Sequence, residues 1–426
     1  KKNGFTLVEI TVCVVLLVTI FLIVVPKVNT MINNKKKNAY NSLISTVKDA
    51  AQAYVYLNVN IVDDAIESQG YYEVSIRTLQ ENELLENKLE NPLTGKNIPS
   101  TSIVKIIKNN EEYIYKFSLD YQYLLEHIID LYSSEETRIS NGLKKDNTPD
   151  QNIRYYGSDP NNYVSFNNEL WRIIGVFGDN VKLVRSESLG SLSWDTSESS
   201  VNGGYGVNEW SQADLQVYLN KMYYGGTTVT CYGGSNNTTT CPTNKLDDAS
   251  KTLIDNHLWN TGAIDETDTT IVNQETFALN TVPFYNAERG NVTGKICNGG
   301  GRCNDTVERA TTWTGYIGLP YATDYAYASS ESICETNMQK QDSSNAYICK
   351  NNNWMFKPNT WYWTMSPRAR ASDASLVWIV RVDGLTGDSP ASFANAVFPA
   401  IYLKSNVIIE SGTGTSSDPY ILKASA

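Results

Sequence analysis

Residues 1–28 read KKNGFTLVEITVCVVLLVTIFLIVVPKV, a long apolar run that carries a carboxylate near its start. Two lysines precede the run, Glu9 lies inside it, and Pro26 lies near its end. About nineteen residues, at 7–25, are mostly apolar, which is enough for a helix to span a bilayer. We therefore predict a membrane helix over about residues 5–26.

A helical pattern continues beyond the apolar run. Apolar residues recur there at steps of three and four, as on one stripe of an amphipathic helix: Tyr40, Leu43, Ile44, Val47, Ala50, Ala51 and Tyr54. The two parts together predict one N-terminal helix over residues 5–58, roughly 75–80 Å long at 1.5 Å per residue.

The following stretch predicts a small domain with a β-hairpin. A short helix is expected at 75–84, a hairpin at the turn Asn109-Asn110, and a further helix at 121–132. Together these elements define a head domain over 59–132.

A change of composition separates the head from the rest of the chain. Residues 133–152 are polar, lack an apolar period and contain Pro149, so we predict a linker there. Residues 153–426 alternate short β-rich runs with turns, and they predict a large displayed domain.

Length and charge limit the classes of function. The chain has 426 residues, enough for two or three domains. Its 35 basic and 46 acidic residues give a net charge of −11, which argues against nucleic acid as the main partner. Charged residues make up only 19% while tyrosine (27) and tryptophan (9) are plentiful, as in a secreted β-rich protein.

Six of the cysteines fall as sequential neighbours: Cys231 and Cys241, Cys297 and Cys303, and Cys334 and Cys349. Six cysteines allow fifteen pairings, and this spacing favours three local loops without fixing the connectivity. No CxxC knuckle or nearby histidine supports a metal site, so we predict none. Disulfide bonds indicate an oxidising location outside the cytoplasm.

The sequence offers little for catalysis. The chain has two histidines, His127 and His257, and neither lies near an obvious cluster of ligands. We find no zinc signature, nucleophile elbow or phosphate-binding loop. We therefore predict no catalytic residue and no cofactor, and we expect that the protein is not an enzyme.

The opening stretch resembles the N-terminus of type IV pilins and pseudopilins, of the class III prepilin type, through the hexapeptide GFTLVE at residues 4–9. In that family a membrane peptidase cuts between the glycine and the phenylalanine, and the new amino terminus is N-methylated. The resemblance implies a cut between Gly4 and Phe5. Glu9 then becomes the fifth mature residue and Pro26 the twenty-second, where these pilins often carry a helix-bending proline.

The resemblance also gives Glu9 a role in assembly. An ionisable group in hydrocarbon costs on the order of a few kcal/mol and tends to be paired. Cleavage would create an amine at Phe5, which Glu9 of a neighbouring subunit could meet in a filament and so set the axial register. The alternative is a signal anchor whose carboxylate is incidental, and Pro26 would kink the helix of any single-span protein.

Residues 71–118 resemble the globular head of pilins from Gram-positive bacteria. The rest resembles a surface module of unknown function from Gram-positive gut bacteria, in stretches such as LWRIIGVFGDNVKLVRS (170–186) and WYWTMSP (361–367). This second resemblance implies an α+β core that is C-type-lectin-like or sulfatase-modifying-factor-like. The predicted fold is therefore α+β, with a long N-terminal helix, a small hairpin head and a β-rich, disulfide-containing domain.

One segment of the displayed domain contains candidate ligand contacts. Its sequence WYWTMSPRAR carries Trp361, Tyr362, Trp363, Arg368 and Arg370. Exposed aromatic rings stack on sugars or partner side chains, and arginine makes bidentate contacts. Trp361 and Trp363 alternate on a strand and would share one face, so packing in the core is the favoured interpretation.

These observations predict a subunit, expected to be a minor one, of an extracellular type IV pilin-like filament that displays a large domain for adhesion or ligand binding. The expected partners are other pilin subunits, prepilin peptidase, the membrane, and a host or surface glycan or protein. The alternatives are a pseudopilin of a secretion or DNA-uptake machine, which alone would meet nucleic acid, and a single-span surface-anchored enzyme. The predicted location is the membrane before assembly and then the surface of a Gram-positive bacterium.

Overall fold

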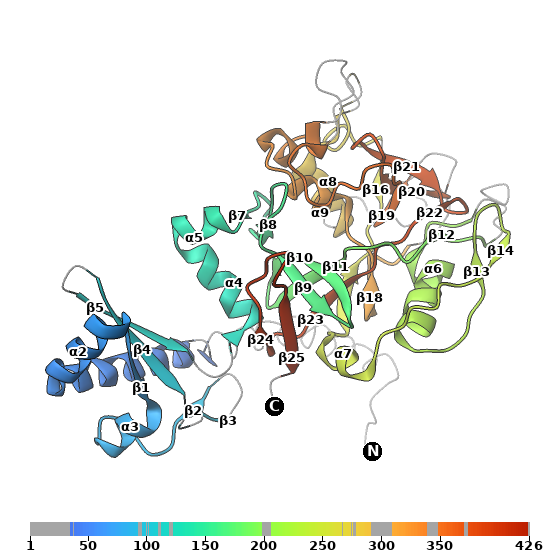
Figure 1. The fold of residues 1–426 in the computed structure, drawn as a ribbon. Helices are drawn as coiled ribbons and strands as arrows, with labels where there is room; N and C mark the ends of the chain where they lie inside the picture. Colours follow the sequence, from blue (N-terminus) through green and yellow to red (C-terminus); the bar gives the residue numbers. More distant parts are fainter. Residues whose placement is uncertain are drawn as a thin grey trace, which may run out of the picture. The chain divides into compact units, whose positions relative to one another are not determined.

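A computed structural model places the chain in two compact units, Lys1–Gln122 and Tyr123–Ala426, which are described separately (Figure 1). The boundary falls within the two-residue strand β6 (Gln122–Tyr123). The structure describes residues 35–36, 38–92, 96–98, 100, 102–109, 112–118, 122–197, 206–265, 267–273, 275, 278–290, 309–338, 348–369 and 374–424.

The first unit places helices against a three-stranded antiparallel sheet with the order β1-β4-β5. Strands β4 and β5 form a hairpin whose register runs from the pair Ile103↔Ser118 to the pair Asn109↔Glu112. After the helical residues 38–57, the elements of this unit are α2 (Val59–Gln69), β1 (Tyr72–Ser75), α3 (Ile76–Glu81), β2 (Glu90–Asn91), β3 (Lys96–Asn97), β4 (Ile103–Asn109) and β5 (Glu112–Ser118).

One face of the helical segment 38–57 forms part of this unit's core. Val47 and Ala51 are fully buried there, and they pack in one cluster with Val104 and Ile106 of β4. All seven residues of the predicted apolar stripe lie in this cluster or against it. The apolar stripe predicts this packing because residues three and four apart share one side of a helix, and that side meets the apolar face of the sheet.

The prediction of an α+β fold with one long N-terminal helix and a C-type-lectin-like domain is wrong. The described residues are rich in strands, which form several sheets, and they contain no helix of about fifty residues. The helical segment ends at Asn58, whose backbone leaves the helical region (φ −132°, ψ 30°) and whose side-chain amide donates to the Tyr54 carbonyl at 2.9 Å. Helix α2 then starts anew.

The predicted membrane segment and its site residues lie outside the described residues, which begin at residue 35. Within the described part of the chain, no helix combines the length and the apolar character needed to cross a bilayer.

The second unit is built on two main sheets. The first has the order β18-β23-β11-β10-β9-β25-β24, with β8 on β10 and β7 on β8. Its strands are β7 (Leu143–Lys145), β8 (Ile153–Tyr155), β9 (Tyr163–Phe166), β10 (Glu169–Phe177), β11 (Asn180–Arg185), β18 (Ile317–Gly318), β23 (Ala400–Leu403), β24 (Val407–Ser411) and β25 (Tyr420–Ala424).

The second sheet has the order β12-β22-β19-β20-β21, and β16 pairs in parallel with β19. Every residue of LVWIV, the sequence of β20, is buried, because the strand is covered on both faces and therefore needs no polar alternation. The strands of this sheet are β12 (Ser191–Ser193), β16 (Ile264–Asp265), β19 (Tyr362–Ala369), β20 (Leu376–Val380), β21 (Thr386–Pro390) and β22 (Ala394–Ala396).

Short helices and two small strand pairs complete this unit. The strand pairs are β13 (Cys231–Tyr232) with β14 (Thr238–Thr239), and β15 (His257–Asn260) with β17 (Thr312–Gly315). The helices are α4 (Leu124–Ser133), α5 (Glu135–Ser140), η1 (Trp210–Gln212), α6 (Asp214–Val217), η2 (Tyr218–Tyr224), α7 (Asp248–Leu253), α8 (Thr281–Glu288), α9 (Ala322–Tyr327), η3 (Ser332–Glu335) and η4 (Ile348–Lys350).

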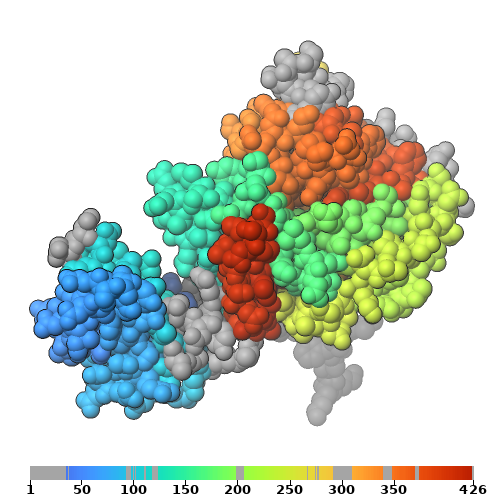
Figure 2. Space-filling model, viewed as in Figure 1, coloured from blue at the N-terminus to red at the C-terminus, as the bar shows by residue number. Residues whose placement is uncertain are grey.

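The end of the described chain is built into this unit. Strand β25 pairs in parallel with β9, and β24 contacts α4. In the space-filling view these red strands lie between the teal segment that contains α4 and the green strands (Figure 2).

Residues 133–152, which were predicted as a linker, form part of this unit. They contain α5 and β7, and β7 pairs with β8 from Leu143↔Tyr155 to Lys145↔Ile153. The polar composition that indicated a linker has another cause, because Asp146 is a buried partner of Arg154. The division between the two units lies at residues 122–123 instead.

Candidate functional site

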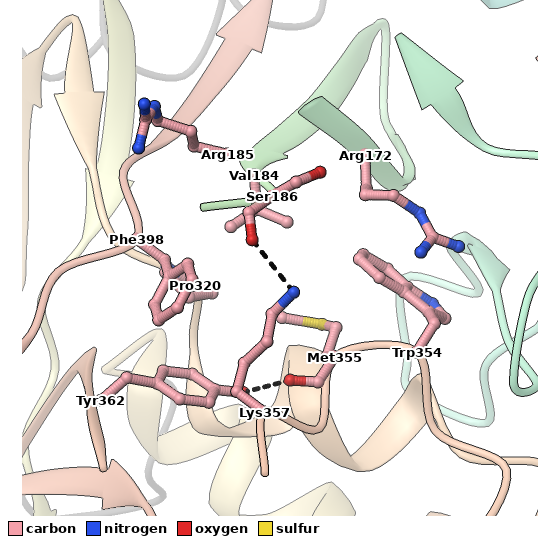
Figure 3. A pocket seen from close by; sticks show the side chains of 10 residues that line it. All are labelled: Arg172, Val184, Arg185, Ser186, Pro320, Trp354, Met355, Lys357, Tyr362 and Phe398. Carbon is pink, nitrogen blue, oxygen red and sulfur yellow. Dashed lines mark hydrogen bonds between the residues drawn. The ribbon is translucent and has the colours of Figure 1, made fainter. Parts of the chain in front are cut away.

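A pocket with basic and aromatic walls lies where strands of both main sheets approach each other (Figure 3). Its interior volume is about 10 Å³, room for about one water molecule, so it suits a single small polar group of a ligand. Ten residues line it: Arg172, Val184, Arg185, Ser186, Pro320, Trp354, Met355, Lys357, Tyr362 and Phe398.

Strands β10 and β11 supply two arginines, one on each side of the pocket. Arg185 forms a bidentate ion pair with Glu169, at 3.0 and 3.1 Å, so its charge is largely balanced. Arg172 donates from Nε to the Asn162 side-chain oxygen at 2.5 Å, and its nearest carboxylate oxygen, on Asp159, is 3.5 Å away. Burial lowers the pKa of Arg172 to about 10, so the group stays charged at neutral pH.

Lys357 contributes a cation without an ion pair in the described part of the chain, although the Glu187 carboxylate attracts it and raises its pKa against the effect of burial. Its Nζ donates to the backbone carbonyl of Ser186 at 3.1 Å, as the dashed line in Figure 3 shows. Among the residues that the structure describes, no carboxylate forms an ion pair with it. Burial and the nearby charge of Arg172 lower the pKa of Lys357. An anion beside this amine would relieve both effects.

Ser186 adds a polar atom to the same wall. Its hydroxyl oxygen is buried, and it has no hydrogen-bond partner within the described structure. A buried hydroxyl without a partner costs about 1–3 kcal/mol, so a ligand oxygen bound at this position would recover that energy.

Aromatic rings form the remaining walls. Tyr362 and Phe398 pack edge to face with their centroids 5.2 Å apart, and the Tyr362 hydroxyl donates to the Met355 carbonyl at 3.1 Å. On the opposite side the Arg172 guanidinium lies 4.9 Å from the Trp354 ring centroid. These contacts fix the positions of the pocket walls.

The predicted ligand segment WYWTMSPRAR divides between the core and the surface. Tyr362 and Trp363 are buried in β19, while Trp361 precedes the strand and is 43% exposed. Arg368 is half-buried and pairs with Asp388, and Arg370 lies outside the described residues. Of the four of these residues that the structure describes, Tyr362 alone lines the pocket.

Two of the predicted cysteine pairs are disulfides. Cys231–Cys241 and Cys334–Cys349 bridge Cα atoms that are 5.2 and 5.7 Å apart. Cys297 and Cys303 lie outside the described residues. The first disulfide fixes the loop around the β13–β14 pair, and the second joins η3 to η4.

Four deeply buried charged residues form a separate cluster. Arg154 of β8 contacts Asp146 at 2.8 Å and Asp324 at 2.5 Å, and Lys182 of β11 contacts the other oxygen of Asp324 at 2.6 Å. All four side chains are 0–1% exposed. Burial alone would raise the pKa of Asp324, but Lys182 and Arg154 outweigh it and the pKa is lowered.

Sequence reasoning missed this cluster and the pocket, although a pattern pointed to both. Lys182 and Arg185 interrupt the apolar run of β11, and Arg172 interrupts that of β10. A charged residue inside a buried strand needs a partner there. The partners could not be found from the sequence because Asp324 follows Lys182 at a separation of 142 residues.

The residues predicted for processing and assembly, Gly4, Phe5, Glu9 and Pro26, lie outside the described residues. In the described part of the chain, no three His, Cys, Asp or Glu side chains gather as a metal site would require. Comparison with protein-family models, with curated proteins and with solved structures finds no match to this chain.

Proposed function

We propose that the protein is a type IV pilin-like subunit of a bacterial surface filament and that its second unit binds an acidic ligand. The first part of the proposal rests on GFTLVE at residues 4–9, placed directly before an apolar run. It is supported by the first unit, where the apolar stripe of residues 38–57 packs on a small antiparallel sheet. We expect cleavage by prepilin peptidase and N-methylation at Phe5.

The second part of the proposal rests on one observation, which is that the amine of Lys357 in the pocket has no ion pair among the described residues. Lys357 is partly buried, donates to a backbone carbonyl and forms no ion pair among the described residues, although Glu187 attracts it. Aromatic walls and the unpartnered Ser186 hydroxyl accompany it. This combination suits one oxygen of a carboxylate or sulfate group on a surface glycan or protein, because the lysine attracts the anion and the serine hydroxyl can donate to it. A displayed domain with such a pocket would serve adhesion.

The binding proposal is tested with the purified full chain on arrays of acidic and neutral glycans. We expect retention on carboxylated or sulfated glycans and at least a tenfold loss of affinity in Lys357→Met, about the 1.4 kcal/mol expected for one charged hydrogen bond. Lys404→Met is the matched control, because the exposed Lys404 also donates to a backbone carbonyl, that of Thr252 at 2.7 Å. Equal binding by both variants would contradict the proposal.

The assembly proposal is tested in the filament-bearing host. Glu9→Gln should leave the amount of protein in the membrane unchanged and deplete the sheared filament fraction, because the variant cannot pair with the Phe5 amine. Glu67→Gln, on the exposed side of α2, is the control and should assemble normally. Normal filament incorporation of the Glu9 variant would contradict a role for this carboxylate.

A further inference from the structure

The buried pair formed by Lys182 and Asp324 has the geometry of two reactants. The Lys182 amine lies 2.6 Å from Oδ2 of Asp324, and neither side chain is exposed. The pair joins the middle of β11 to the first turn of α9, across 142 residues of sequence. Both groups are held in place, so the amine stays within reach of the Asp324 carboxyl carbon.

The surroundings favour the uncharged form of the Lys182 amine. Four aromatic rings surround the Lys182 amine, at 4.1 Å (Tyr321), 5.3 Å (Tyr402), 5.4 Å (Trp259) and 5.6 Å (Phe177) from their centroids. Burial lowers the pKa of Lys182 to about 8, against the opposing effect of Asp324. In such a site, passing one proton from the amine to the carboxylate removes two buried charges.

Arg154 stands where a reaction at the carboxyl carbon would place negative charge. Its NH1 donates to Oδ1 of Asp324 at 2.5 Å, and the salt bridge to Asp146 fixes its orientation. The backbone N–H of Tyr321 donates to Oδ2 at 2.9 Å. Fixed donors on both oxygens would stabilise a tetrahedral intermediate, as preformed donors do in acyl transfer.

From this geometry we propose that Lys182 and Asp324 form an intramolecular isopeptide bond. The ammonium passes a proton to Oδ2, and the neutral amine attacks the carboxyl carbon. Arg154 holds the oxygen that becomes the amide oxygen. Oδ2 leaves as water and takes up a second proton from the nitrogen. One N–C bond forms and one C–O bond breaks, and no oxidant, metal or other reactant is needed.

The bond would tie β11 to α9 and thereby fasten the large sheet to the helix that precedes the Cys334–Cys349 disulfide. The chain between the two residues could then not be pulled out as a linear strand. This inference concerns the cross-link alone, and it stands or falls separately from the proposed pilin-like assembly and ligand binding.

The test is a peptide map of the purified full chain after reduction and alkylation. We expect one branched peptide that joins the segments around Lys182 and Asp324, at the sum of their masses less one water, with loss of both linear peptides. The exposed pair Lys251 and Asp248, in contact at 3.0 Å, is the internal control and should remain linear. Lys182→Arg keeps the charge but forms no such amide, so its Asp324 peptide should be linear.

The peptide map of the wild-type protein tests for the isopeptide bond even if the Lys182 variant fails to fold. A digest in which linear peptides with unmodified Lys182 and Asp324 account for the protein would overturn the proposal. So would a branched peptide that persists in the Lys182→Arg chain, because the link would then involve another residue.

Discussion

The Tyr420 hydroxyl lies 2.8 Å from Nε2 of His127, although 293 residues separate the two in sequence. Their rings also meet edge to face, with centroids 5.4 Å apart. Tyr420 belongs to β25 and His127 to α4, so this contact fastens the end of the described chain to the beginning of the second unit. Burial lowers the pKa of His127 to about 4.

This contact predicts a loss of stability in mild acid. An unfolded histidine has a pKa of about 6.5 and takes up a proton below that pH, while native His127 does not until about pH 4. The free energy of unfolding should therefore fall as the pH drops through this window, by about 3 kcal/mol in total. Urea unfolding followed by tryptophan fluorescence measures it, because all nine tryptophans lie beyond residue 123.

The control for this prediction is His127→Asn, which cannot take up a proton. Its unfolding free energy should depend less on pH between about 6.5 and 4, and His257, whose pKa burial also lowers, should contribute to the remaining slope. An unchanged slope in the variant would show that other groups cause the acid sensitivity.

The two disulfides should each stabilise the second unit. They close loops with sequence separations of 10 and 15 residues. Replacing either pair by serines should lower the free energy of unfolding by about 3 kcal/mol in the chain-entropy account. Urea titration of each double variant measures the loss, and a thiol assay on the unfolded wild-type chain before reduction should find these four cysteines blocked. Reactive thiols at these positions would contradict the pairing.

Arg154 should be the most sensitive charged residue of the core. Arg154→Met removes a buried cation from between Asp146 and Asp324, and breaking such a pair typically costs about 3–5 kcal/mol. Lys251→Met should change stability by less than about 0.5 kcal/mol, because its partner Asp248 has a side chain that is 99% exposed. Thermal unfolding of both variants compares the two sites. An equal loss of unfolding free energy in both variants would mean that burial does not determine how much breaking an ion pair destabilises the protein.

Gly175 should tolerate no side chain. The register of β10 against β11 shifts between Ile173 and Gly175, and a Cβ at Gly175 would overlap the Ile153 carbonyl oxygen of β8. Gly175→Ala should therefore destabilise the second unit by about 1–3 kcal/mol or more, as overpacking does. Gly178→Ala has open space but a φ of +59°, so it should cost only about 1 kcal/mol. Equal losses, measured by urea unfolding, would contradict this steric account.

Local patterns in the sequence predicted local structure well. The apolar stripe from Tyr40 to Tyr54 packs in the core of the first unit, and the hairpin turns next to Asn109. A short helix expected at 75–84 is present as α3, where the Ser75 hydroxyl accepts from the Thr78 N–H at 3.0 Å. These features depend on side chains within a few residues of one another, which a single sequence displays.

Features that depend on distant partners were not predictable. The polar stretch 133–152 was interpreted as a linker because nothing near it reveals that Arg154, the partner of Asp146, also binds Asp324, 170 residues further along the chain. Trp361 and Trp363 were assigned to one face, but Trp361 precedes β19 and is exposed. The pocket joins residues from 172 to 398. The sequence could therefore indicate it only through the charged residues that lie within otherwise apolar strands.

The central claim, that this chain enters a filament by the pilin pathway, is tested most directly by the N-terminus of the mature protein. Mass spectrometry of the protein from its peptidase-positive host should find a first peptide that begins at Phe5 with an N-methyl group. A protein in which the bond between Gly4 and Phe5 remains intact would contradict the claim.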